Sequence, residues 1–145
     1  MKTAAEILKS KPDHAVYTIA PTATVLDAVT LMARKGIGAL LVMDHEKIVG
    51  IVTERDYARK VILLGRASKE TPVRVIMTSE VMYVRPGHTS EECMALMTEN
   101  RVRHLPVMDD GKLIGLLSIG DLVKDIISEQ RFTIEQLEHY IRGGP

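Results

Sequence analysis

The chain has 145 residues, of which 46% are apolar and 26% charged, with 19 basic residues against 19 acidic ones. This profile is typical of a globular protein long enough to bury a core without disulfides or structural metals. A zero net charge lacks the basic surplus of proteins that bind nucleic acid or anionic membranes, and four tyrosines and one phenylalanine are too few for a base-stacking platform. We therefore expect neither nucleic acid nor membrane among the partners.

The cellular compartment is suggested by two features of the sequence. The apolar runs, such as residues 36–43, fall far short of the ~18 residues of a membrane span, and the start MKTAAEILKSKPD has no apolar signal segment. The single cysteine, Cys93, cannot form an internal disulfide. We predict a cytoplasmic protein in which Cys93 is a buried apolar residue.

An internal repeat organises the chain. A shift of 65 residues aligns Val16–Ile62 with Val81–Ile127 without a gap, and 13 of these 47 pairs are identical. Upstream, AAEILKS and VRVIMTS resemble each other at a separation of 69, because the first repeat carries four extra residues around positions 11–14. Two small halves are expected to pack on one another. We divide the chain into residues 1–65 (first repeat with an N-terminal helix), 66–127 (linker and second repeat) and 128–145 (helical tail).

The first repeat predicts, in chain order, a strand, a helix, two strands joined by a polar turn, and a second helix. Thr24 and Asp27 form a capping box, which marks the start of the first helix. The expected bounds are Val16–Ala20, a helix to about Lys35, Ala39–Met43, Ile48–Val52 and a helix from Thr53.

The second repeat predicts the same order of elements, so the fold class is α/β (α+β) with a β-α-β-β-α unit used twice. A polar linker, Gly65–Thr71, precedes it, with Thr71 as a helix cap before Pro72. A tail helix over Ser128–Arg142 carries an apolar stripe suited to docking on another surface. The expected bounds are Val81–Arg85, a helix to about Asn100 from a capping box at Thr89, Leu105–Met108, Leu113–Leu117 and a helix from Ser118.

One motif occurs in both repeats at the start of the second helix. Gly50 and Gly115 each begin a run of glycine, two aliphatics, a hydroxyl residue, two further residues and aspartate, which ends at Asp56 or Asp121. Free backbone N–H groups at a helix start favour a phosphate, and an aspartate one turn later can accept hydrogen bonds from a ribose diol. The alternative is an ordinary capping box, which the same spacing also describes. The glycine and the two aliphatics favour the ligand.

The sequences GALLVMDHEKIVGIVTERD and RVRHLPVMDDGKLIGLLSIGD, with the doubled motif, resemble a tandem of CBS domains over about residues 4–127. The resemblance implies two repeats packed face to face with pseudo-two-fold symmetry, with clefts between them for AMP, ADP, ATP, NAD or, less favoured, S-adenosylmethionine. It implies a regulatory sensor for signal transduction that acts on an unknown partner protein, and a homodimer. The alternative is a scaffold or enzyme-regulating protein whose clefts are vestigial.

The resemblance also implies that each cleft is shared, with ribose and phosphate held by one repeat and the base by the other. If so, Arg55, Arg103 and His104 make the first cleft the more positive one, and we expect it to bind the nucleotide more tightly. The alternative is that Arg103 and His104 lie beside Asp121. The first cleft would use Thr53, Arg55 and Asp56 with Met82, Tyr83, Val102, Arg103, His104 and Pro106. The second would use Ser118, Gly120 and Asp121 with Tyr17, Thr18, Ile37, Gly38 and Ala39.

Catalytic and metal chemistry find little support in the sequence. Ser118 lacks the glycine two residues before it that a nucleophile elbow requires, and no general base adjoins it, so a nucleotide hydrolase is disfavoured. Four histidines stand isolated in polar segments, without the spacing of metal ligands. We expect no catalytic residue and no metal, and a homodimer formed through the outward helix faces of Ala28, Met32, Met94 and Met97. Arg101 is interpreted as a solvated helix end.

Overall fold

The structure, a computed structural model, describes residues 2–143 and divides into two compact units. The first-repeat unit is Val16–Met82, and the second-repeat unit joins the chain up to Ala15 to the chain from Tyr83 onward. Helix α1 (Ala4–Ser10) thus precedes the first repeat in sequence but packs with the second. The reason is its apolar face, because Ala4 and Ile7 are buried in the core of the second repeat. The sequence-based division kept residues 1–65 together. In the structure, the segment up to Ala15 groups with the second repeat instead.

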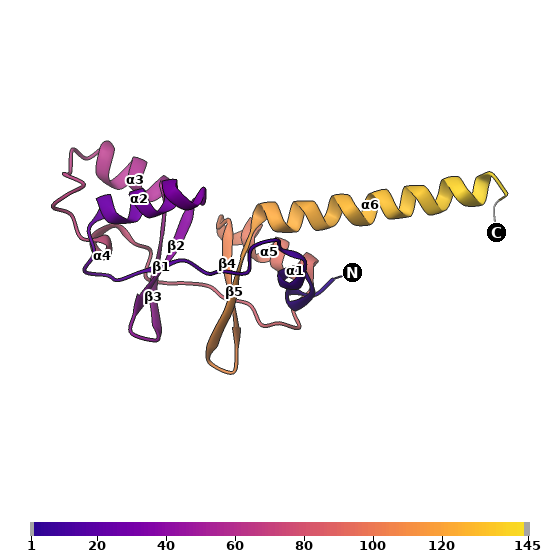
Figure 1. Ribbon diagram of the computed structural model, residues 1–145, viewed down its shortest axis with the longest axis horizontal. Helices are drawn as coiled ribbons and strands as arrows, with labels where there is room; N and C mark the ends of the chain where they lie inside the picture. Colours follow the sequence, from indigo (N-terminus) through magenta and orange to yellow (C-terminus); the bar gives the residue numbers. More distant parts are fainter. Residues whose placement is uncertain (1, 144–145) are drawn as a thin grey trace. The chain divides into compact units, whose positions relative to one another are not determined.

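The first-repeat unit holds a three-stranded sheet in the order β1-β2-β3, with β1 parallel and β3 antiparallel to the central β2 (Figure 1). The predicted order of elements is confirmed, although the first strand is shorter than expected because only two of its residues pair with β2. The bounds are β1 Thr18–Ile19, α2 Val25–Lys35, β2 Ala39–Asp44, β3 Lys47–Thr53, α3 Glu54–Tyr57, a π-helical turn η1 Ala58–Ile62, and α4 Val73–Ile76.

The second-repeat unit repeats the hairpin in the same register. His104 pairs with Ser118 as Ala39 pairs with Thr53, and both hairpins carry a bulge at the equivalent place, after Val107 and after Val42. The strand expected over Val81–Arg85 is reduced to a single parallel bridge between Val84 and Val107. The bounds are α5 Ser90–Asn100, β4 His104–Asp109, β5 Lys112–Ser118 and α6 Ile119–Ile141.

Three helix ends test the sequence predictions. The C-cap of α5 is Arg101, which is exposed and has a φ of 54°, so its interpretation as a solvated helix end is confirmed. The predicted cap at Thr71 is wrong, because its hydroxyl donates to Ala67 O and the N-cap of α4 is Pro72. The separate tail helix is also wrong. Helix α6 is continuous over 23 residues, since neither glycine nor proline interrupts the sequence between residues 121 and 142, and Figure 1 shows it as one rod.

Each unit has its own apolar core, and most of the helix residues that were expected to point outward are buried in these cores. Ala28 and Met32 are buried in the first-repeat core, and Cys93 and Met97 in the second. The expectation of outward helix faces is therefore wrong for Ala28, Met32 and Met97, and holds in part for Met94, which is only partly buried. Exposed apolar residues occur instead at the end of η1, at Ile62, Leu63 and Leu64, and on the second half of α6, at Phe132, Ile134, Leu137, Tyr140 and Ile141.

A glycine near the middle of each hairpin allows another segment of the chain to cross it closely. A β-carbon on Gly50 of β3 would lie 2.5 Å from Met77 Sδ and 3.0 Å from the backbone oxygen of Thr78. A β-carbon on Gly115 of β5 would lie 2.6 Å from a methyl group of Leu8, which lies within α1. The glycine of the motif is therefore a packing residue. Gly50 allows the segment after α4 to lie against β3, and Gly115 allows α1 to lie against β5.

We predict that Gly50→Ala lowers the free energy of unfolding by about 1–3 kcal/mol, the usual cost of overpacking a core, because the backbone of Thr78 cannot move aside as a side chain can. Urea denaturation followed by circular dichroism measures this loss. Gly87→Ala is the matched control, since a β-carbon there meets nothing within 4 Å. Equal stability of the two variants would contradict the prediction.

Candidate functional site

The doubled motif forms a capping box at the start of the second helix in each repeat. Thr53 donates its backbone N–H to Asp56 Oδ2 at 3.0 Å, and the hydroxyl of Thr53 accepts from the N–H of Asp56 at 3.2 Å. Ser118 N–H donates to Asp121 Oδ2 at 2.8 Å, and its hydroxyl accepts from Asp121 N–H at 3.2 Å. The capping interpretation of this spacing is therefore confirmed. It leaves open a second role for the two aspartates.

Burial separates these two capping boxes from the other three among the described residues. The boxes that begin at Thr3, Thr24 and Thr89 are exposed. In contrast, the side chains of Asp56 and Asp121 retain only 14% and 18% of their exposure. A carboxylate with so little access to water is costly unless donors and positive charge surround it. These aspartates are therefore more buried than a helix cap requires, which agrees with the second role that the preceding glycine and aliphatic residues suggested.

A lysine supplies this positive charge in each repeat. Lys60 Nζ lies 3.2 Å from Asp56 Oδ1 and donates to the backbone oxygen of Ile76 at 2.9 Å. Lys11 Nζ lies 2.9 Å from Asp121 Oδ2 and donates to Leu116 O at 2.8 Å. Sequence reasoning missed both lysines. The spacing of four residues between Asp56 and Lys60 was a usable signal, whereas Lys11 stands 110 positions from Asp121 and no local pattern connects them.

The residues before each hairpin lie against the helix start of their own repeat. Glu54 N–H donates to Gly38 O at 3.1 Å, and Ile119 N–H donates to Arg103 O at 2.8 Å. His104 is the cross-strand partner of Ser118. Of the two arrangements that the sequence left open for Arg103 and His104, the structure thus favours the one beside Asp121. A contribution of Arg103 and His104 to the Asp56 cleft would join the two units, and it stays a prediction.

The same geometry gathers Ile37, Gly38 and Ala39 near the Thr53 to Asp56 segment, in the first-repeat unit. The expected sharing of each cleft joins residues of the two units, and it stays a prediction. The remaining predicted site residues fall at the following places. In the first-repeat unit, the Lys35 ammonium lies 5.2 Å from the centre of the Tyr17 ring, and Thr18 of β1 pairs with Leu41 of β2. Pro106 is buried in β4 and Val102 is partly buried. The exposed members of the predicted set are Arg55 and Gly120, at their helix starts, and Met82 and Tyr83.

The charge state of His104 follows from its surroundings. Burial lowers the pKa of His104 below its ordinary value, because the imidazolium loses hydration. Asp121 opposes this shift by favouring the cation, while Lys11 and Arg103 add to it by repulsion. His104 is therefore neutral near pH 7. It lies close to Lys11, Arg103 and Asp121, at the start of the 23-residue helix α6.

We predict that this histidine makes the folding stability depend on pH. Because the pKa of His104 is lower in the folded than in the unfolded chain, the unfolded chain binds more protons below about pH 6.5, and the stability falls as the pH drops from about 7 to 5.5. In His104→Gln this part of the loss should disappear, as measured by urea denaturation at each pH. His14→Gln, at an exposed position, is the control. A wild-type slope in His104→Gln would refute the assignment.

The described residues 2–143 offer little support for other chemistry. They contain no group of three His, Cys, Asp or Glu side chains arranged to hold a metal ion. No helix in this part of the chain has both the length and the apolar character to cross a membrane. Cys93 is a free, buried thiol whose pKa is raised by desolvation and by the charge of Glu92, in agreement with its interpretation as an apolar core residue.

The repeated hairpin, the doubled motif and the close crossing at each glycine can now be compared with known proteins. The family model of the CBS domain matches residues 4–62 and again residues 73–128. The chain belongs to the CBS-domain family. The predicted fold, a mixed α and β tandem of two CBS repeats, is thereby confirmed.

Similar CBS proteins cover nearly the whole chain. A mitochondrial CBS domain-containing protein of Arabidopsis thaliana is 41% identical over 98% of this chain and 73% of its own. The structure of a candidate signal-transduction protein with CBS domains from Burkholderia ambifaria MC40-6 is 62% identical, with a TM-score of 0.87 over 89% of this chain and 96% of that one. A hexameric CBS-CP12 protein from bloom-forming cyanobacteria is 36% identical, with a TM-score of 0.74 over 83% and 70%. The chain matches at least 70% of the length of each of these relatives.

Proposed function

We propose that this CBS tandem is a sensor of adenine nucleotides, which binds AMP, ADP, ATP or NAD, does not convert them, and transmits their presence to a partner protein. The observation that carries the proposal is the pair of largely buried aspartates, each fixed at a helix start by a backbone N–H and a lysine. A fixed carboxylate that still has lone pairs is a suitable acceptor for the two hydroxyl groups of a ribose. S-adenosylmethionine is the less favoured ligand, because it has no phosphate for the basic residues.

The two sites receive different roles in this proposal. We assign the ribose to Asp56 in one site and to Asp121 in the other. The phosphate is assigned to Arg55 in the first site, and to Arg103 and His104 in the second, because charge-assisted hydrogen bonds are the stronger kind. The second site thus has one more hydrogen-bond donor for a phosphate close to its aspartate, because the neutral imidazole of His104 can donate an N–H beside the charged Arg103. We therefore propose that it binds the phosphorylated ligand more tightly, which reverses the order inferred from the sequence.

Calorimetry with AMP and ATP tests this function. Asp121→Asn keeps the shape of the cap but removes the charged acceptor, and is expected to weaken binding about tenfold or more; Asp56→Asn should weaken it less. Asp27→Asn, in an exposed capping box, is the matched control. Wild type with ligand at 100 times its Kd should gain about 2.7 kcal/mol of stability.

Three results would contradict the proposal. If no adenine nucleotide at millimolar concentration stabilises the protein, the clefts are vestigial and the chain is a scaffold or an enzyme-regulating interaction protein. If the nucleotide is consumed at enzyme-like rates, the protein is a catalyst and not a sensor. If Asp56→Asn costs more affinity than Asp121→Asn, the order of the two sites is the one inferred from the sequence.

The cytoplasm remains the compartment we propose, because a buried free thiol suits reducing conditions.

We further propose a homodimer, formed through the exposed apolar face of α6 and not through the buried methionine faces. Support comes from Ile134, Leu137 and Ile141, which stand exposed on one side of a helix that extends beyond the rest of its unit (Figure 1). The cyanobacterial relative is described as hexameric, so a related chain does associate.

Analytical ultracentrifugation should find a dimer of about twice 16.1 kDa in the wild type and a monomer in the double variant Ile134→Ser, Leu137→Ser. The double variant Arg131→Ser, Glu138→Ser, on the same helix, is the control. A wild-type monomer at working concentrations would exclude the dimer.

A further inference from the structure

Lys11 reaches the second site from outside the repeated motif. It is the residue that follows α1, and its ammonium bridges Asp121 Oδ2 and the backbone oxygen of Leu116, at 2.9 Å and 2.8 Å. All three residues belong to the second-repeat unit. The contact therefore places a basic side chain from the N-terminal segment directly on the aspartate to which we assign the ribose.

The two lysines of the sites come from positions that the repeat does not relate. The shift of 65 residues takes Lys60 to Asp125, and the shift of 69 that aligns AAEILKS with VRVIMTS takes Lys11 to Glu80. Asp125 is itself buried and lies 3.1 Å from Lys2 Nζ, so it brings no positive charge to Asp121. Lys11 thus fills, from the segment where the first repeat carries extra residues, a role that the second repeat cannot supply.

The donors and acceptors around Asp121 leave room for a ligand. A lysine ammonium has three N–H groups, and the two contacts of Lys11 use two of them. Both the lysine and Ser118 N–H bind Oδ2 of Asp121, whereas in the first site Lys60 occupies Oδ1 and Thr53 occupies Oδ2 of Asp56. The side chain of Lys11 keeps 26% of its exposure, so it is accessible to a dissolved anion.

We propose that Lys11 is a specificity-determining residue of the second site, which selects a phosphate-bearing nucleotide over the uncharged nucleoside. Its third N–H donates to a phosphate oxygen while Asp121 Oδ1 accepts from a ribose hydroxyl. This inference rests on the proposed nucleotide binding. It adds a residue outside the CBS motif, and it makes the docking of α1 on the second repeat a requirement for phosphate selection.

Calorimetry of the full chain with AMP and with adenosine tests the proposal, in the Asp56→Asn background so that the second site dominates. Lys11→Gln removes the charge but can still donate to Leu116 O, and is expected to raise the Kd for AMP about tenfold or more. Adenosine should bind unchanged or more tightly, because Asp121 loses a competing donor. Lys11→Arg should keep the preference for AMP.

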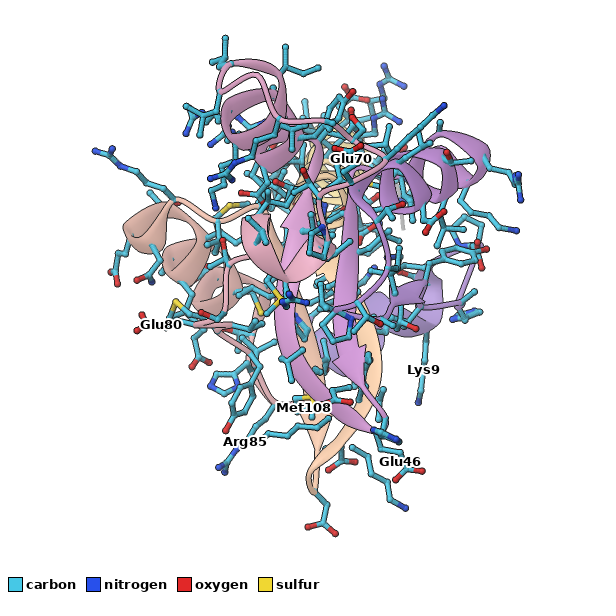
Figure 2. All side chains as sticks on the ribbon, turned by 90° about the vertical axis from the view of Figure 1, so that its left-hand side faces the viewer. Lys9, Glu46, Glu70, Glu80, Arg85 and Met108 are labelled. Atoms are coloured by element: carbon cyan, nitrogen blue, oxygen red, sulfur yellow. The ribbon has the colours of Figure 1, made fainter. Side chains whose placement is uncertain are left out.

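The matched control is Lys9→Gln, which removes the same charge from α1 at an exposed position; Figure 2 shows the Lys9 side chain pointing away from the ribbon. Lys11→Met replaces Lys11→Gln if the latter fails to fold. Equal losses for AMP and adenosine, or no loss for either, would show that Lys11 only neutralises Asp121, and would overturn this inference alone. A wild type that binds neither compound at millimolar concentration would overturn the proposed function and the inference with it.

Discussion

The structure depends on the need to compensate a carboxylate that has been largely withdrawn from water. Asp56 and Asp121 are each held at the point where a buried strand passes into a helix, and there an isolated negative charge would be strongly unfavourable. Backbone N–H groups and one lysine per site provide the compensation. Because the lysines also bind the main-chain oxygens of Ile76 and Leu116, they tie each aspartate to a neighbouring segment.

The close crossing at Gly50 and Gly115 makes this arrangement possible. Only a residue without a side chain allows Met77 or Leu8 to lie this close to the strand. Each belongs to a segment that also reaches the site, through Ile76 just before Met77 and through Lys11 shortly after Leu8. In the second-repeat unit the crossing segment brings Lys11 to Asp121. In the first-repeat unit the crossing segment contributes only the oxygen of Ile76, and the cation comes from the helix after the motif.

The two repeats therefore share a backbone and differ in the side chains that surround the aspartate. Their hairpins agree in register and even in the place of the bulge, yet the first repeat surrounds its aspartate with Lys60 and an exposed Arg55, and the second with Lys11, Arg103 and His104. Two similar sites with different hydrogen-bond donors can respond to different nucleotides, or to one nucleotide over a wider range of concentration. Such a division suits a protein that reports on a ligand and does not transform it.

Local patterns determined much of this protein from the sequence alone. The shift of 65 residues, the capping boxes at Thr24 and Thr89 and the apolar alternation predicted the helices and hairpins, because each depends on contacts between residues near one another in the chain. The doubled motif identified both aspartates. The short first strands and the continuous α6 were missed, since strand length depends on available pairing partners and helix length on the absence of a stop signal.

Only the tertiary structure decided which residues serve which aspartate. Arg103 and His104 lie beside Asp121 because the antiparallel pairing of β4 with β5 brings the start of one strand to the end of the other. Lys11 reaches the same aspartate because α1 buries Ala4 and Ile7 in the second repeat instead of the first. Contacts across 110 positions arise from the packing of apolar surfaces, which no local pattern of residues records.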